Sequence, residues 1–198
     1  MSVMNPATVE RIIVQLTQDS IQQTLDDWEM QVEFVAKIGE GTARLVKSGE
    51  GFANFWNNDP VLRVQTQVER AATGPVQIFF STETAWPLLK SVLCLPGGAE
   101  RPPGGVFDDE QVEAFSEMMN MLCGSANTVY DRYGLRLSQG VDHLKVSQED
   151  PGIPEDVRGL IVTLPYEVDG CETREIVQAM PFPLALKVAK AIEASKAA

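Results

Sequence analysis

The sequence predicts an α+β fold in which a mostly antiparallel sheet packs against long helices. Apolar residues recur at helical spacing over about 6–28 and again over 108–133. They recur at nearly every second position over 61–68, and Asp169-Gly170 is a typical hairpin turn between two further strand-like segments. Strands that are grouped between helices are typical of α+β proteins. The length of 198 residues fits one domain, 1–198.

The first expected element is a long helix over about 6–28. Asn5 is a favourable N-cap residue, and Pro6 is tolerated at the first helical position. The apolar residues that follow are spaced as one helical face, which we interpret as core: Val9, Ile12, Ile13, Leu16, Ile21, Leu25 and Trp28.

Short β-prone segments are expected between the first helix and residue 81. The segment 61–68 alternates as a strand, and 76–80 is a denser strand after a turn expected at Gly74-Pro75. The segment 31–58 favours neither strand nor loop. No internal repeat is visible in the sequence.

A second helix is expected over about 84–95, followed by a glycine- and proline-rich linker over 97–106. Thr84 is predicted as its N-cap, because Pro87 would then lie in the first turn, where a missing N–H leaves no helical hydrogen bond unmade. The glycine pairs of the linker lack the spacing of a phosphate-binding loop.

A long helix is expected from Asp108 to about Tyr133. Asp108 and Gln111 have the spacing of a capping box, and Gly134 is a typical C-terminal glycine. At 100° per residue the helix has two stripes. The stripe expected to be buried contains Phe115, Leu122, Ala126, Val129 and Tyr133, and the polar stripe contains Glu113, Glu117, Asn120, Gly124, Asn127 and Asp131.

The remaining segments predict strands followed by a closing helix. Residues 135–144 and 159–168 are expected to be strands, and a return strand is expected over about 172–179. Pro181 ends that strand, and 184–197 is predicted to be a helix with lysines in its later turns.

The composition excludes several classes of function. Sixteen basic and 28 acidic residues give a formal charge of −12, which repels nucleic acid and anionic membrane surfaces. The single histidine, His143, excludes sites that need two imidazoles. Cys94, Cys123 and Cys171 lack metal-binding spacing, and sparse thiols suit a cytoplasmic protein without disulfides. No secretory signal and no apolar segment of about 18–20 residues is visible, so no membrane insertion is expected.

The polar stripe holds the best candidates for chemistry. Glu117 and Asn120 are three residues apart, so their side chains are neighbours on the helix. Asparagine is a mediocre residue for a helix interior, and Gly124 one turn later costs about 1 kcal/mol relative to alanine. These features suggest a face that another molecule approaches closely, although a merely solvated face is the simpler interpretation.

The segment Glu113-Ala-Phe-Ser-Glu117-Met-Met-Asn120-Met-Leu-Cys-Gly124 resembles the signature helix of the CheC/CheX/FliY chemotaxis phosphatases. That signature is an acidic residue or serine, three residues, Glu, two residues, Asn, and then a turn of small residues. The similarity is greatest to CheX and covers most of the chain. It extends to Gly74–Leu95, which is similar to a strand and helix of the family, and to Leu160–Met180, similar to its closing hairpin.

The resemblance implies a phosphatase that removes the phosphoryl group from the aspartate of a CheY-type response regulator. Asn120 would position the attacking water, and Glu117 would pair with a lysine of the regulator. Glu113, Gly124 and Asn127 would contact the partner. The protein would need no cofactor and no metal of its own, because magnesium would belong to the phosphorylated receiver domain. A homodimer like that of CheX is also implied.

Two departures from the family leave alternatives open. CheC and FliY carry two copies of the signature, whereas this sequence has one, which agrees with CheX. The family has a proline about 21–22 residues after the asparagine, whereas Gly140 and Asp142 occupy that register here. A receiver-binding or flagellar-switch adaptor without catalytic activity is therefore the main alternative, and a purely structural dimer is a third. His143 is interpreted as structural in preference to catalytic, and Cys123 as boundary packing in preference to a nucleophile.

Overall fold

The computed structural model describes residues 4–29, 36–47, 60–96, 98–138, 143–147, 158–168 and 173–197. The helices are α1 (Pro6–Glu29), α2 (Thr82–Val92), α3 (Asp109–Tyr130) and α4 (Phe182–Lys196), with short 3₁₀ turns η1 (Pro103–Gly105) and η2 (Asp131–Tyr133). The strands are β1 (Ala36–Ile38), β2 (Thr42–Val46), β3 (Val61–Arg70), β4 (Gly74–Ser81), β5 (Leu135–Leu137), β6 (Lys145–Ser147), β7 (Gly159–Val168) and β8 (Arg174–Pro181). None of the helices in these ranges is both long and apolar enough to span a bilayer.

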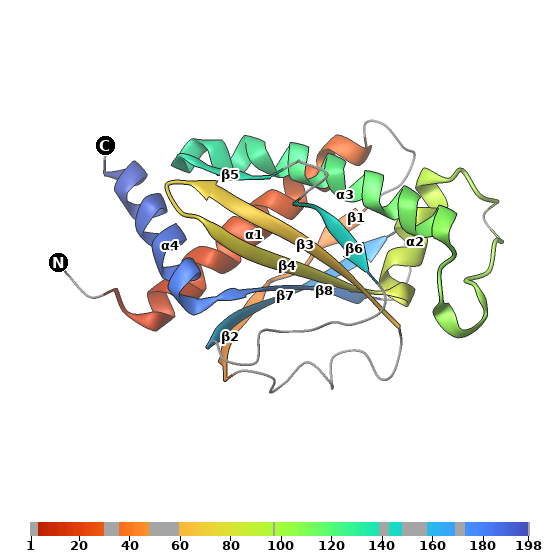
Figure 1. Cartoon of the computed structure of the whole chain (residues 1–198), viewed down its shortest axis with the longest axis horizontal. Helices are drawn as coiled ribbons and strands as arrows, with labels where there is room; N and C mark the ends of the chain where they lie inside the picture. Colours follow the sequence, from red (N-terminus) through yellow and green to blue (C-terminus); the bar gives the residue numbers. More distant parts are fainter. Residues whose placement is uncertain are drawn as a thin grey trace.

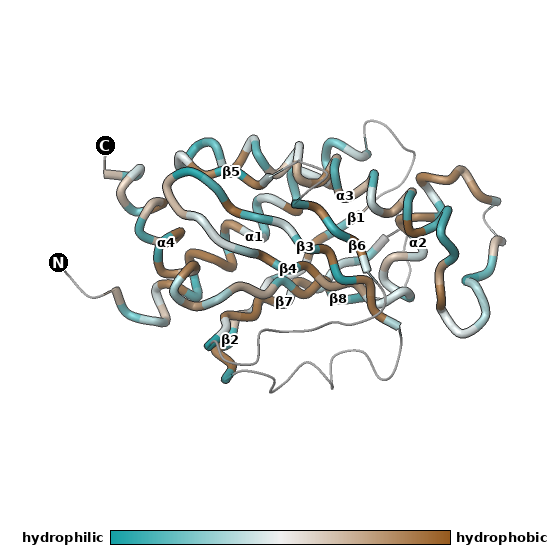
Figure 2. The backbone as a smooth tube through the Cα atoms, in the orientation of Figure 1, coloured by the Kyte–Doolittle hydropathy of each residue, from teal (hydrophilic) through white to brown (hydrophobic). Residues whose placement is uncertain are grey.

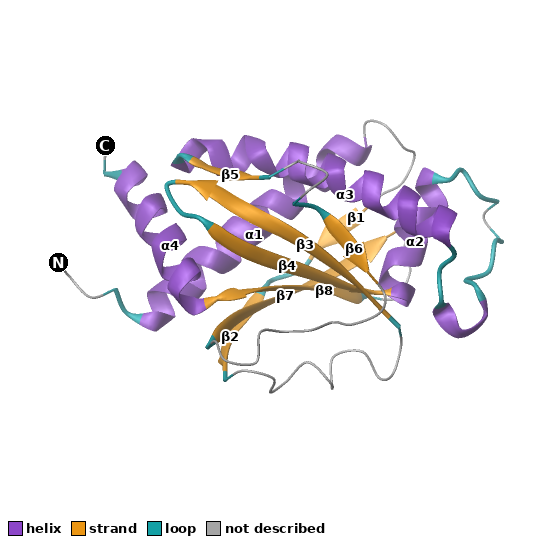
Figure 3. Ribbon diagram, viewed as in Figure 1, coloured by secondary structure: helices purple, strands orange, loops and turns teal. Residues whose placement is uncertain are grey.

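The strands form one curled antiparallel sheet, which confirms the predicted α+β class (Figure 1). Its order is β1-β7-β8-β4-β3-β5, with β2 also paired to β7 and β6 also paired to β3. Helices α1 and α3 contact each other and pack against the sheet, whereas α2 and α4 lie at its two opposite ends (Figure 3).

The fold contains an internal repeat with approximate twofold symmetry. The order α1-β1-β2-β3-β4-α2 is followed by α3-β5-β6-β7-β8-α4. Exchanging the two halves maps the strand order onto itself, including the additional pairs β2–β7 and β6–β3. The axis passes between β4 and β8, where Ile78 pairs with Gln178. The sequence does not show this repeat because the two halves have different side chains in equivalent places.

The two long helices have matching patterns of burial. Eight buried positions of α1 coincide with buried positions of α3 when 102 is added to the residue number. They are Ile13, Leu16, Thr17, Ser20, Ile21, Thr24, Leu25 and Trp28 in α1, and Phe115, Met118, Met119, Leu122, Cys123, Ala126, Asn127 and Tyr130 in α3. Under this correspondence Gln15 is the counterpart of Glu117, and Gln18 is the counterpart of Asn120.

Local sequence chemistry determines where α3 begins and ends. Asp108 Oδ1 accepts a hydrogen bond from the Gln111 N–H at 2.8 Å, and Gln111 Oε1 accepts one from the Asp108 N–H at 3.1 Å. This is the predicted capping box. After η2, Gly134 has φ of 64°, the left-handed conformation that favours glycine.

The apolar stripes predicted for the long helices are largely confirmed as core. All seven apolar residues singled out in α1 are buried. In α3 the predicted residues Phe115, Leu122, Ala126 and Val129 are buried, whereas Tyr133 beyond its end is half-buried. The tube of α3 alternates between hydrophobic and hydrophilic colours along its length, as expected of a helix with one buried face (Figure 2).

The predicted start of the second helix is wrong. Helix α2 begins at Thr82, and Ser81 is its N-cap, because the Ser81 Oγ accepts a hydrogen bond from the Thr84 N–H at 3.0 Å. Thr84 is buried inside the first turn. Pro87 therefore lies beyond the first turn, and α2 forgoes one backbone hydrogen bond there.

Two strand predictions also need correction. Gly74 and Pro75 belong to β4 and are not a turn. Pro75 pairs with Gln67 of β3, while the pairing of β4 with β8 begins at Gln77. A proline is tolerated there because its missing N–H falls outside the β4–β8 ladder. Of the strand expected over 135–144, the described residues contain only β5; β6 begins just beyond it, at Lys145, and both strands pair with β3. The predicted turn at Asp169-Gly170 lies outside the described residues.

The capping box leads to a prediction about stability. The Asp108→Ala variant should have a free energy of unfolding about 1 kcal/mol lower than the wild type, because the Gln111 N–H loses the side-chain oxygen that accepts its hydrogen bond. Urea unfolding measures this difference. Asp109→Ala is the matched control, since Asp109 is also exposed in the first turn but is not the cap residue. Equal losses in both variants would contradict the role of the capping box.

Candidate functional site

The two glutamates of the polar stripe of α3 have exposed side chains. Glu113 and Glu117 both face solvent. Within the part of the chain that the structure describes, neither carboxylate has a hydrogen bond or an ion pair. Glu117 is therefore available to a positive group on another molecule.

Asn120 lies at the edge of this stripe and is half-buried. Its Oδ1 atom is shielded from solvent and has no hydrogen-bond partner. A buried carbonyl oxygen without a partner costs about 1–3 kcal/mol, so such atoms are rare in folded proteins and need an explanation. Because this oxygen is buried, a water or another donor from outside reaches it only if the carboxamide turns toward solvent.

The residues after Asn120 shape the same surface. Gly124 is half-buried one turn later on the stripe. Met121, which sequence reasoning had not placed on this face, is 40% exposed beside Glu117. By helical geometry Met121 lies about 40° from Glu117, so the stripe combines a carboxylate, an amide and a flexible apolar side chain.

The prediction that Asn127 lies on the exposed stripe is wrong. Asn127 is 6% exposed and is bonded through both ends of its carboxamide to one residue of β5. Its Oδ1 accepts from the Leu137 N–H at 2.7 Å, and its Nδ2 donates to the Leu137 carbonyl at 3.0 Å. Helical arithmetic gave the direction of the side chain correctly but could not show that β5 packs on that side.

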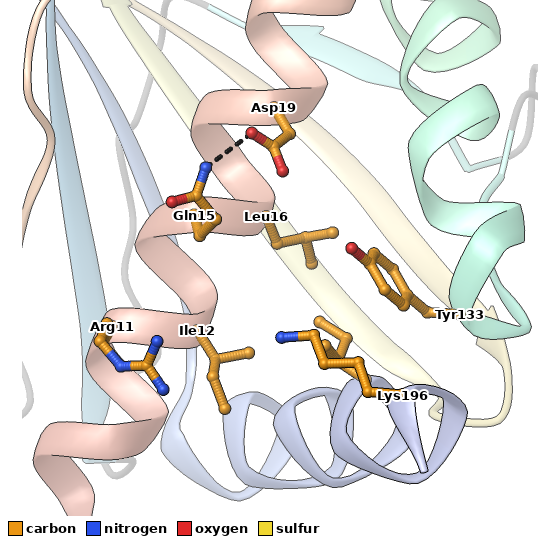
Figure 4. Close-up of a pocket in the computed structure, with 8 residues that line it drawn as sticks. Arg11, Ile12, Gln15, Leu16, Asp19, Tyr133 and Lys196 are labelled. Carbon is orange, nitrogen blue, oxygen red and sulfur yellow. Dashed lines mark hydrogen bonds between the residues drawn. The ribbon is translucent and has the colours of Figure 1, made fainter. Parts of the chain in front are cut away.

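The equivalent stripe of α1 has different chemistry. Gln15 replaces Glu117 and donates to Asp19 Oδ1 at 2.7 Å, as Figure 4 shows. Gln18 replaces Asn120, and its Nε2 donates to the Gly39 carbonyl at 3.2 Å, just after β1. Arg11, Asp19 and Lys196 line a small hollow beside this stripe, so both charge signs are present there. Only the α3 stripe combines a free carboxylate with an unbonded amide oxygen among the described parts of the two helices.

The other candidate groups do not add a reactive centre. Burial raises the pKa of the Cys123 thiol to about 12. Burial, and then the nearby Cys123, raise the pKa of the Tyr130 hydroxyl. His143 is exposed. The described ranges contain no group of three or more His, Cys, Asp or Glu side chains that could hold a metal ion.

Comparisons of sequence give no relative, whereas comparisons of structure do. No family model and no curated protein matches the chain. FliY of Thermotoga maritima matches with a TM-score of 0.76 at 15% identity, covering 98% of this chain and 100% of that one. FliM of H. pylori, solved in a complex with SpeE, matches with a TM-score of 0.73 at 8% identity, covering 98% of both chains. A CheX from Desulfovibrio desulfuricans matches with a TM-score of 0.53 at 13% identity, covering 84% of this chain and 97% of that one.

The chain has the fold of FliY, FliM and CheX. The resemblance seen in the sequence is thus confirmed at the level of fold. The overlap is more complete for FliY and FliM than for this CheX, whereas the sequence motif predicted the greatest similarity to CheX. In this fold the stripe of Glu117 and Asn120 lies on one of the two long helices that cover the sheet (Figure 1).

The burial of Cys123 leads to a prediction about reactivity. At pH 8 a thiol with a pKa of about 12 is ionised in roughly one molecule in ten thousand. Cys123 should therefore resist alkylation in the folded protein, whereas the exposed Cys94 should react. Peptide mass spectrometry after iodoacetamide treatment measures both residues, and urea should make Cys123 reactive. Rapid labelling of Cys123 without denaturant would contradict its burial.

Proposed function

We propose that the protein is a phosphatase for the aspartyl phosphate of a CheY-type response regulator in chemotaxis signalling in the cytoplasm. The observation that supports this proposal is the exposed, unpaired carboxylate of Glu117 one turn before the half-buried Asn120, whose carboxamide has no hydrogen-bond partner at its oxygen. The fold is compatible with it, since FliY and CheX share that fold. The sequence motif supplies the roles of the residues.

In the proposed reaction Asn120 holds the attacking water. Once the carboxamide has turned toward the partner, its Oδ1 accepts a hydrogen bond from the water, while the amide nitrogen donates to a phosphoryl oxygen. The water oxygen bonds to phosphorus and the bond to the aspartate oxygen breaks, giving inorganic phosphate and a free aspartate. Phosphoryl transfer needs little covalent help, so positioning a water in line is itself a catalytic contribution.

Glu117 fixes the position of the partner in this proposal. An exposed, unpaired carboxylate one turn before Asn120 is placed to pair with a lysine of the receiver domain. Glu113 and Gly124 contact the partner on either side, and Gly124 allows close approach because it has no side chain. The magnesium ion belongs to the receiver, and the protein contributes no cofactor of its own.

The Asn120→Ala variant tests the catalytic step. Dephosphorylation of the phosphorylated receiver should become slower by a factor on the order of 10², while binding of the receiver changes little. Stopped-flow fluorescence or loss of radiolabelled phosphate measures the rate. The matched control is Gln18→Ala at the equivalent position of α1, which should keep the wild-type rate. Equal decay with and without the wild-type protein would end the proposal for that receiver.

The Glu117→Gln variant tests the docking contact. The KM for the phosphorylated receiver should rise about tenfold, because one ion pair is replaced by a neutral contact. The dependence of KM on salt should also become weaker, since the pair is screened by ions. Glu40→Gln is the control with the same change of charge, on an exposed residue between β1 and β2. A KM that does not change would remove Glu117 from the interface.

The main alternative is an adaptor that binds the receiver or a flagellar-switch protein without catalysis. The extensive overlap with FliM favours it, and one FliM of that fold was solved in a complex with FliG. The absence of the family proline near Gly140 also favours it. Binding of the phosphorylated receiver with unaltered decay in the assay above would identify an adaptor. The homodimer stays a prediction.

A further inference from the structure

In each half of the fold, a side-chain carboxamide on the long helix forms a hydrogen bond with the backbone in or directly after the short edge strand. We call this bond the carboxamide clamp. In the first half, Gln18 Nε2 donates to the Gly39 carbonyl at 3.2 Å, immediately after β1. In the second half, Asn127 bonds both backbone groups of Leu137 in β5, at 2.7 and 3.0 Å. Both clamps join a long helix to the equivalent strand, since β1 and β5 exchange under the internal twofold.

The two clamps are made from different helical positions. Gln18 is the counterpart of Asn120, and the counterpart of Asn127 is Leu25 in the buried face of α1. In the first half the clamp therefore uses the position that carries the candidate catalytic amide in the second half. In the second half the clamp is formed two turns later, and the Oδ1 of Asn120 is left without a partner.

We propose that Asn127 is a positioning residue for the active site, an inference that rests on the proposed phosphatase function. In α3 the hydrogen bonds to the edge strand are made by Asn127, whereas in α1 they are made by Gln18, the counterpart of Asn120. The Asn120 carboxamide is therefore not used in the clamp. Asn127 lies on the same side of α3 as Asn120, about 10 Å further along the helix. Its two hydrogen bonds fix the distance between α3 and β5. Strands β5 and β6 both pair with β3.

A second set of bonds holds β5 in place from the opposite side. The Ser138 N–H donates to the Gln67 carbonyl at 2.8 Å, and the Ser138 hydroxyl donates to Glu69 Oε1. The end of β5 is thus held between α3 and β3. Because β3 pairs on its other side with the central strand β4, Asn127 aligns the Asn120 face of α3 with the sheet. Catalytic positioning requires this kind of support, since a displacement of about 1 Å can cost a factor of 10² in rate.

The Asn127→Leu variant is the direct test, because leucine is the residue at the equivalent position of α1. It removes the clamp and keeps an apolar side chain of similar size. The kcat for receiver dephosphorylation should fall about tenfold, with KM changed less than twofold, when activity is measured well below the melting temperature. The melting temperature should fall by about 3–10 °C, because the Leu137 N–H and C=O lose their partners in a buried site.

Two further variants separate positioning from stability. Gln18→Leu removes the clamp of the first half and should leave kcat unchanged. Asn127→Gln keeps both a donor and an acceptor for the backbone groups of Leu137, so it should recover part of the kcat lost in Asn127→Leu. If Gln18→Leu lowers kcat as much as Asn127→Leu does, or if Asn127→Leu keeps the wild-type kcat, the inference is wrong.

Nuclear magnetic resonance tests the inference without any receiver. In Asn127→Leu the side-chain amide resonances of Asn120 should shift or broaden, and the Leu137 amide should exchange at least tenfold faster with solvent. Gln18→Leu should change neither. If the wild type fails to dephosphorylate any receiver but these spectral changes occur, the proposed function fails and the positioning of Asn120 by Asn127 stands. Unchanged Asn120 resonances in Asn127→Leu would overturn the inference itself.

Discussion

The pairing of β4 with β8 is the constraint on which the rest of the structure depends. These central strands join the two halves into one sheet, with Ile78 opposite Gln178 near the twofold axis. Gln178 is buried, and its Nε2 donates to the Thr17 hydroxyl of α1 at 3.0 Å, so the centre of the sheet is also bonded to the helix layer. Once these strands pair, each half must place its long helix over the same face, and α1 and α3 pack together there.

The two helices have equivalent surroundings and different exposed chemistry. In α1 the exposed positions carry Arg11 and Gln15, and the amide of Gln18 is bonded to the backbone. In α3 the equivalent positions carry free carboxylates and the unbonded Asn120 oxygen. The backbone bond that Gln18 makes in α1 thus has no counterpart at Asn120, whose oxygen is buried without a partner.

The sequence was informative wherever a structure is decided by neighbouring residues. The capping box at Asp108 and the left-handed Gly134 bracket α3, and the exposed Glu117 follows from helical spacing alone. It was misleading where a distant segment decides the outcome. Asn127 is buried because β5 packs against it, a contact that has no trace in the local pattern. The start of α2 was an error of a different kind, because Ser81 is itself a favourable N-cap residue and its bond to the Thr84 N–H is local.

The sequence by itself determined the α+β class, the long helices with their buried faces, and the placement of Glu117 and Asn120 as neighbours on one helix. These follow from backbone geometry and the burial of apolar side chains, which act over a few residues. Only the tertiary structure decided the internal twofold, the separation of Asn127 from the exposed stripe, and the unbonded state of the Asn120 oxygen. Those properties depend on contacts between segments that are far apart in the chain. The local spacing of residues does not indicate which distant segments will pack together.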